Sequence, residues 1–199
     1  MRPEKPKIRL RAARLNDILR LNEIELAADR LFEGTGLLDQ SPADSAIPVS
    51  AFEQAISEDL CHVAVDAHDA PVGFTFCTDR RPDLYLDQVS VDPGFARLGI
   101  GRRLVNHVAD IAADRRFACV SLSTFRDVAW NGPFYQSLGF MPLEANELTD
   151  WMKELEAYQS AYLDITQRCF MRRPVKPRPL QRIRERFLRS RSNKVSIKS

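Results

Sequence analysis

The spacing of apolar residues changes repeatedly along this chain, and each change of period predicts a different element. Strict alternation predicts a half-buried strand, whereas apolar residues three or four positions apart predict an amphipathic helix. Asp17 and Thr149 are placed to cap the helices that follow them. In chain order the pattern predicts a strand at 8–12, a helix from Asp17 to Phe32, a loop at 34–48, a helix at 49–58, strands at 61–65, 72–77 and 83–91, a helix at 99–115, a strand at 117–124, a helix at 132–138, a strand opening at Phe140, a helix from Thr149 to about 158, and a last strand at 162–172.

This order of elements predicts an α/β fold with a single mixed, mostly antiparallel sheet flanked by helices. The three consecutive strands in the middle of the chain give the sheet its antiparallel run. The third of them, 83–91, carries an irregularity, because its apolar alternation slips by one residue between Leu86 and Val89. A β-bulge produces such a slip, since it inserts one extra residue into a strand.

Composition is that of an ordinary globular protein, with 44% hydrophobic and 28% charged residues in a chain of 199. No apolar run approaches the roughly 18 residues that cross a bilayer. The first residues are polar and lack the apolar core of a secretory signal, so we expect a cytoplasmic protein. Charge is divided unevenly. Residues 174–199 contain nine Lys or Arg and one Glu, a balance of +8, whereas the residues before them hold 20 basic and 26 acidic side chains, a balance of −6.

The cysteines and histidines give no reason to expect a metal site. They are dispersed, no Cys-x-x-Cys pair occurs, and every cysteine falls within a predicted strand, which is typical of small buried residues in a reducing compartment. The cysteines are Cys61, Cys77, Cys119 and Cys169, and the histidines are His62, His68 and His107.

A glycine-rich turn, RLGIGR over 97–102, leads from the strand at 83–91 into the helix at 99–115. The N–H groups in the first turn of a helix lack partners and lie at the positive end of its dipole. Glycine also lets the backbone approach an anion closely, so the turn favours phosphate binding. A dinucleotide fingerprint would need a third glycine where Leu104 stands, and a P-loop would need Gly-Lys-Ser/Thr. A glycine pair that merely packs is the structural alternative.

Two segments together resemble a known family. LDQVSVDP at 86–93, continued by GIGR at 99–102, resembles motif A of the GNAT superfamily of N-acetyltransferases, and TFRDVAWNGPFY at 124–135, continued by LGF at 138–140, resembles its motif B. With the order of elements, the resemblance covers about 7–173, which predicts an N-acetyltransferase domain there and a basic tail at 174–199. The family splays its sheet where the bulge is predicted. Ala96 departs from the Gln or Arg usual in the family, and Arg97 beside it can supply that side chain.

The resemblance implies acetyl-CoA as cosubstrate and a set of residues that hold it. The backbones of Val89 and Val91 would pair with the pantetheine arm as an added strand does. Asn131 would contact the same arm. The pyrophosphate would be held by Arg97, Leu98, Gly99, Ile100, Gly101 and Arg102.

The resemblance also implies direct acetyl transfer to a primary amine within a ternary complex. Tyr135 matches the tyrosine that protonates the departing thiolate, and a phenol can stabilise charge developing on sulfur. The amine must lose its proton, and Asp87, at a place where relatives often carry Glu, is the expected base, acting through a water. Glu25 and Glu33 are the alternatives. The other functional hypothesis is a non-catalytic acyl-CoA-binding module.

The acceptor is expected to be a small-molecule or peptide amine, and the sequence leaves open whether the chain is a monomer or a homodimer. The aromatic candidates for the acceptor site are Phe32, Phe52, Trp130, Trp151 and Tyr162, and packing in the core is the alternative for each of them. In the tail, apolar residues on one helical face lie between arginines, which is typical of a basic amphipathic helix that docks on an anionic partner such as a membrane or RNA. Packing on the acidic body and a solvated coil are the alternatives for the tail.

Overall fold

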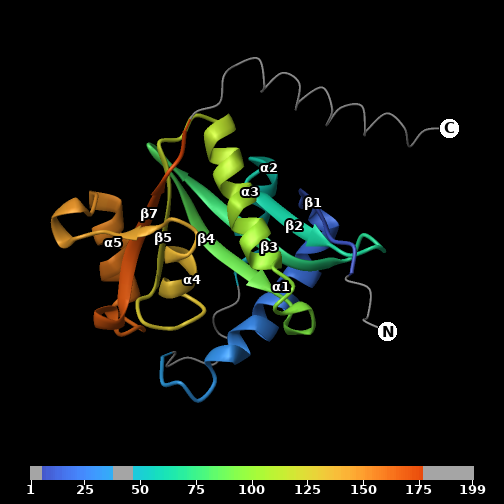
Figure 1. Cartoon of the computed structure of the whole chain (residues 1–199), viewed down its shortest axis with the longest axis horizontal. Coiled ribbons are helices and arrows are strands. Elements are labelled where there is room, and N and C mark those ends of the chain that lie inside the picture. The colour runs from blue at the N-terminus through green and yellow to red at the C-terminus, as the bar shows by residue number, and fades with distance from the viewer. Residues whose placement is uncertain (1–5, 38–46, 177–199) are drawn as a thin grey trace.

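The computed structural model describes residues 6–37 and 47–176. Its framework is a seven-stranded sheet in the order β1-β2-β3-β4-β5-β7-β6 (Figure 1). Neighbouring strands are antiparallel except β4 and β5, which are parallel. The strands are β1 (Arg9–Ala12), β2 (Cys61–Val65), β3 (Pro71–Arg80), β4 (Asp83–Val91), β5 (Cys119–Phe125), β6 (Met141–Pro142) and β7 (Arg168–Pro174).

Helices cover both faces of the sheet, and α3 (Ile100–Asp114) crosses one of them (Figure 1). Phe52 packs on Phe74 of β3 with 5.6 Å between ring centroids. A Cβ added to Gly73, the preceding residue of β3, would lie 3.3 Å from Leu104 of α3. Because successive strand residues point to opposite faces, the helix of Phe52 and α3 cover opposite faces. The helices are α1 (Ile18–Asp29), α2 (Val49–Ser57), α3 (Ile100–Asp114), α4 (Gly132–Gln136) and α5 (Asp150–Gln159). The predicted fold class is confirmed.

The predicted apolar stripe of α3 forms the inner face of that helix. Leu104, Val105 and Val108 are at most 1% exposed and pack over the sheet. Gly99 precedes the helix with φ +76°, a left-handed conformation that glycine adopts without the steric cost of a Cβ. The glycine turn and the helix therefore form where the sequence predicts them.

The structure corrects the predicted start of the last strand and the predicted cap of α5. β7 begins at Arg168 rather than at 162, because the Asp164 carboxylate accepts the Thr166 N–H at 3.0 Å and closes a 3₁₀ turn over Ile165–Gln167. Thr149 occupies the position before α5, but its side chain makes no capping hydrogen bond.

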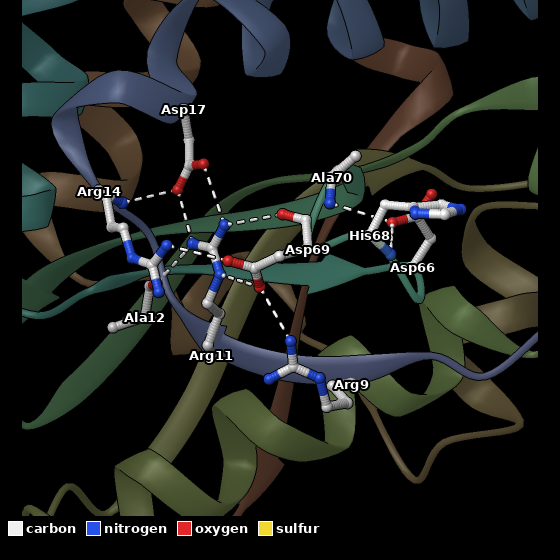
Figure 2. A network of polar contacts seen from close by, with 9 residues as sticks. All are labelled: Arg9, Arg11, Ala12, Arg14, Asp17, Asp66, His68, Asp69 and Ala70. Atoms are coloured by element: carbon white, nitrogen blue, oxygen red, sulfur yellow. Dashed lines mark hydrogen bonds and ion pairs between the residues drawn. The ribbon is translucent and has the colours of Figure 1, made fainter. Parts of the chain in front are cut away.

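Asp17 lies directly before α1, but its carboxylate is used elsewhere (Figure 2). It accepts the Arg14 backbone N–H at 2.8 Å and pairs with Arg11 of β1 at 2.7 Å. Arg11 also reaches Asp69, in the turn between β2 and β3, at 3.0 Å, and Arg9 and Arg14 bind the same carboxylate (Figure 2). The predicted cap of α1 is therefore wrong, and Asp17 instead helps to fasten β1 to the β2–β3 turn.

The four cysteines lie in strands as predicted and are free thiols. In the parts of the chain that the structure describes, no helix is both long and apolar enough to cross a membrane. Apart from Pro174–Lys176, the predicted basic tail lies outside the described residues, and so does most of the loop predicted at 34–48.

Candidate functional site

A cavity of about 1280 Å³ opens where β4 and β5 separate. The two strands pair only from Asp83↔Cys119 to Tyr85↔Ser121. Beyond that point, residues 86–91 of β4 and 122–125 of β5 line the cavity from its two sides. Since the edge of β4 has no β5 partner there, its backbone N–H and C=O groups can pair with a bound ligand.

Asp87 lies at a bulge in β4, as the slip in apolar alternation predicts. The register with β3 passes from Cys77↔Leu86 to Phe76↔Gln88 and leaves Asp87 without a Cα partner. Its side chain is accessible through the cavity, which it lines. The surrounding protein nevertheless desolvates the carboxyl group and raises its pKa to about 7, against the opposing effects of a hydrogen bond from Thr78 and the charge of Arg80.

Glu25 of α1 lines the same cavity and is only 4% exposed. Burial raises the pKa of its carboxyl group to about 7, although the backbone N–H of Ile47 donates to it at 3.3 Å. Glu33, the other alternative base, is exposed and does not line the cavity. The structure therefore brings together two of the three predicted carboxyl groups.

The glycine turn forms the wall at the start of α3. Arg97 and Gly99 have positive φ angles of 62° and 76°, and these two residues line the cavity with Ile100, Gly101 and Arg102, whereas Leu98 does not. A Cβ added to Gly101 would meet Phe134 at 3.7 Å and Val91 at 3.9 Å, which are ordinary contacts. The protein's own packing thus does not require a glycine at 101, but a ligand lying against the backbone would.

The arginines of this segment have different surroundings. Arg97 is exposed at the cavity. Arg102 donates to the Ser137 hydroxyl at the end of α4, at 3.0 Å. Arg103 donates to the carbonyl of Ile8 at 3.0 Å and lies off the cavity wall. Two cationic side chains, those of Arg97 and Arg102, are therefore on the wall that carries the turn.

Tyr135 lies on α4, and Asn131 is the residue just before that helix. The Tyr135 ring packs against Phe134 and Phe140 with centroid separations of 5.2 and 5.6 Å, and the residue lines the cavity. Burial raises the pKa of its hydroxyl, with an opposing effect from Arg168, so the phenol keeps its proton at neutral pH. Asn131 also lines the cavity and accepts the Tyr135 N–H with its backbone oxygen at 2.9 Å.

Three of the five aromatic candidates for the acceptor site line the cavity, namely Phe32, Trp130 and Tyr162. Phe52 does not, because this residue of α2 is fully buried in the core. Trp151 packs on Tyr85 with 5.1 Å between centroids and also lies away from the cavity. For these two residues the alternative, packing within the protein, is the one observed.

The sequence reasoning missed Tyr158, Leu163, Ser123 and Arg168, which complete the wall near Tyr162. Arg168 stands opposite Phe125 in the register of β7 with β5. No sequence signal marks this position, because a single arginine before an apolar strand is common on protein surfaces. Only the pairing of two distant strands brings it to the cavity.

Residues 25–140 match the model of the family described as "Acetyltransferase (GNAT) family". The chain belongs to the GNAT acetyltransferase family. Membership of this family implies acyltransferase activity with acetyl-CoA as cosubstrate, and the acceptors of the family are generally amines or peptides. Among the described residues, no group of three or more His, Cys, Asp or Glu side chains could hold a metal ion.

Solved structures share this GNAT fold at low identity. The PaiA N-acetyltransferase of Thermoplasma acidophilum, in complex with coenzyme A, is 15% identical with a TM-score of 0.66, covering 84% of this chain and 99% of that one. A GNAT acetyltransferase of Staphylococcus aureus is 18% identical with a TM-score of 0.64, covering 85% and 100%. The ribosomal-protein-S18-alanine N-acetyltransferase of Escherichia coli is 18% identical with a TM-score of 0.62, covering 87% and 97%.

Proposed function

We propose that this GNAT protein transfers the acetyl group of acetyl-CoA to a primary amine by direct attack within a ternary complex. The observation that carries the proposal is the position of Asp87, whose carboxyl group has a pKa of about 7 and lies at the bulge where β4 and β5 separate. A base with a pKa near the working pH is effective in taking a proton from an ammonium group.

The cosubstrate lies along the split in the sheet in this proposal. Its pyrophosphate accepts hydrogen bonds from backbone N–H groups of residues 97–102, with Arg97 and Arg102 adding positive charge. Its pantetheine arm pairs with the free edge of β4 at Val89 and Val91, and Asn131 contacts the arm. Support comes from the left-handed turn at the start of α3, the unpaired edge of β4, and the room that Gly101 leaves at the wall.

The chemistry then needs one base and one acid. The ammonium group of the acceptor gives its proton to Asp87, through a water molecule, and becomes a neutral amine. The amine nitrogen attacks the thioester carbonyl carbon, a C–N bond forms, and the C–S bond breaks. Tyr135, protonated at neutral pH because burial raises its pKa, donates a proton to the leaving thiolate, and the second proton that the nitrogen loses as the amide forms restores the phenol.

A thiol-release assay with acetyl-CoA and a panel of primary amines tests this function, with mass spectrometry of the acetylated amine. We expect turnover by the wild type and a loss of about 10²-fold or more in Asp87→Asn, the range for removal of a general base. Asp150→Asn is the matched control, because Asp150 is exposed at the start of α5 and lies away from the cavity.

Calorimetry with coenzyme A separates the ways in which this proposal can fail. Binding without thiol release for any amine would favour the non-catalytic acyl-CoA-binding module. Absence of heat with both coenzyme A and acetyl-CoA would contradict the pyrophosphate site at the start of α3.

A further inference from the structure

The cavity contains a guanidinium group whose position the transfer reaction does not explain. Arg168, the first residue of β7, lines the wall next to β5. Its Nη2 donates to the Ser123 hydroxyl at 3.1 Å, and its guanidinium carbon lies 4.9 Å from the centroid of the Phe125 ring. Its Nε is buried and has no hydrogen-bond partner among the described residues. Aromatic and hydroxyl groups hold the side chain, and these contacts do not neutralise its charge.

The groups that interact with the charge of Arg168 are neutral at physiological pH. They are the phenols of Tyr85, Tyr162 and Tyr135 and the thiol of Cys169. Burial raises the pKa of each of these groups, so all four keep their protons. No carboxylate in the described parts of the chain forms an ion pair with Arg168. A half-buried arginine keeps its positive charge, and a buried charge without a counter-ion is costly, so this wall favours a negatively charged ligand group.

In the proposed function, the anionic groups of the cosubstrate bind at a different wall of the cavity. The turn at 97–102 carries the backbone amides, with Arg97 and Arg102, at the start of α3. Arg168 instead stands at the end of β5 with Tyr162, an acceptor-site residue predicted from the sequence. The accessible carboxyl group of Asp87, on β4, suits an ammonium group. The cavity thus offers an acidic side chain and a separate cation to one acceptor.

We infer that the acceptor amine also carries a carboxylate, and that Arg168 binds it while the amine faces Asp87. This inference rests on the proposed function and names the class of acceptor for it. A planar guanidinium matches the two oxygens of a carboxylate, which makes arginine selective for that group. Arg168 is then a specificity residue that fixes the orientation of an amino acid or a related aminocarboxylate.

Matched pairs of acceptors test the inference directly. Thiol release is measured with free amino acids and with the corresponding amino acid amides, which keep the amine and lose the carboxylate charge. For the wild type we expect kcat/KM to be about tenfold or more higher for the acid than for the amide, mainly because of a lower KM. A loss of that size is typical when one charged hydrogen bond is removed. In Arg168→Met, kcat/KM for the acid should fall to the value for the amide, and kcat/KM for the amide should not change. Arg168→Lys should retain part of the preference.

Arg126→Met is the matched control, because Arg126 donates to the backbone oxygen of Arg168 at 3.0 Å yet is exposed and does not line the cavity. It should keep the wild-type preference. Equal kcat/KM for acids and amides in the wild type would overturn the inference and leave the transferase function standing. An equal loss of kcat/KM for acids and amides in Arg168→Met would have the same meaning. If that variant does not fold, the wild-type comparison and Arg168→Lys still decide. Absence of turnover with every amine would refute the proposed function itself.

Discussion

Asp87 of β4 and Glu25 of α1 line one cavity, and desolvation by the surrounding protein raises the pKa of both carboxyl groups to about 7. Their surroundings differ. Glu25 is 4% exposed and accepts a backbone N–H from Ile47, whereas Asp87 is accessible from the cavity at the bulge of β4. An accessible carboxyl group can exchange a proton with a bound amine, and a buried one that is already bonded has a mainly structural effect. We therefore expect Asp87 to control how the reaction rate depends on pH and Glu25 to control how the stability of the fold depends on pH.

The rate of transfer should rise with pH through about 7, because Asp87 acts as a base only after losing its proton. In Asp87→Asn, kcat/KM should fall by about 10²-fold or more and lose this rising limb. In Glu25→Gln the limb should remain. Thiol-release rates measured from about pH 5.5 to about 9 at saturating acetyl-CoA give both profiles. A limb that vanishes in Glu25→Gln and persists in Asp87→Asn would assign the base to Glu25 instead.

Glu25 should make the folded protein less stable as pH rises. Its folded pKa of about 7 lies above the ordinary 4.5, so the protonated form favours folding. That contribution is fully present below about pH 4.5 and is lost as pH rises through 7. At about 1.4 kcal/mol per pKa unit, the loss is at most about 3.5 kcal/mol.

Urea unfolding at acidic and mildly alkaline pH measures this contribution. The difference in unfolding free energy between Glu25→Gln and the wild type should shift in favour of the variant at the higher pH. The comparison removes the contribution of Asp87, which both proteins share. Glu53→Gln, an exposed position on α2, should follow the wild type. If the unfolding free energies of Glu25→Gln and the wild type change in parallel with pH, Glu25 ionises in the folded protein as it does in the unfolded chain.

Gly101→Ala should weaken binding of coenzyme A without destabilising the fold. The added Cβ meets only ordinary contacts, and alanine is favoured over glycine in helices by up to about 1 kcal/mol. It would also occupy the space through which the pyrophosphate reaches the first turn of α3, so affinity should fall by about tenfold or more, as for a lost charged hydrogen bond. Calorimetry and thermal unfolding test the two effects separately.

Gly132→Ala serves as the contrasting variant for Gly101→Ala. A Cβ at Gly132 would lie 2.0 Å from the carbonyl oxygen of Arg126, so the backbone must move. We expect a loss of about 1–3 kcal/mol in unfolding free energy, the usual cost of overpacking. An affinity for coenzyme A that is unchanged in Gly101→Ala would contradict close approach of the pyrophosphate at this turn.

Tyr135→Phe should reduce kcat by about 10²-fold, because the leaving thiolate loses its proton donor. Affinity for coenzyme A and the melting temperature should stay at wild-type values, since the ring keeps its packing against Phe134 and Phe140. Tyr158→Phe is the control, because Tyr158 also lines the cavity but is 69% exposed. An unchanged kcat would mean that Tyr135 is only a packing residue.

The local pattern of the sequence by itself determined most of the secondary structure of this protein. The change of period located the strands and helices, because burial of one face imposes its repeat on the sequence. The slipped alternation placed the bulge at Asp87, and the glycines marked the left-handed turn before α3. Each of these features depends on neighbouring residues, so the sequence contains the information directly.

Other features depended on which distant segments meet. Asp17 could cap α1 by its position, but the proximity of Arg11 and Asp69 gave its carboxylate other partners. Phe52 and Trp151 are aromatic like Tyr162, yet only Tyr162 reaches the cavity. The raised pKa of Glu25, and the surroundings of Arg168 without an ion pair in the described parts of the chain, arise from burial among residues far away in the sequence. The tertiary structure alone decided these properties, because desolvation and pairing depend on distances that the order of residues does not contain.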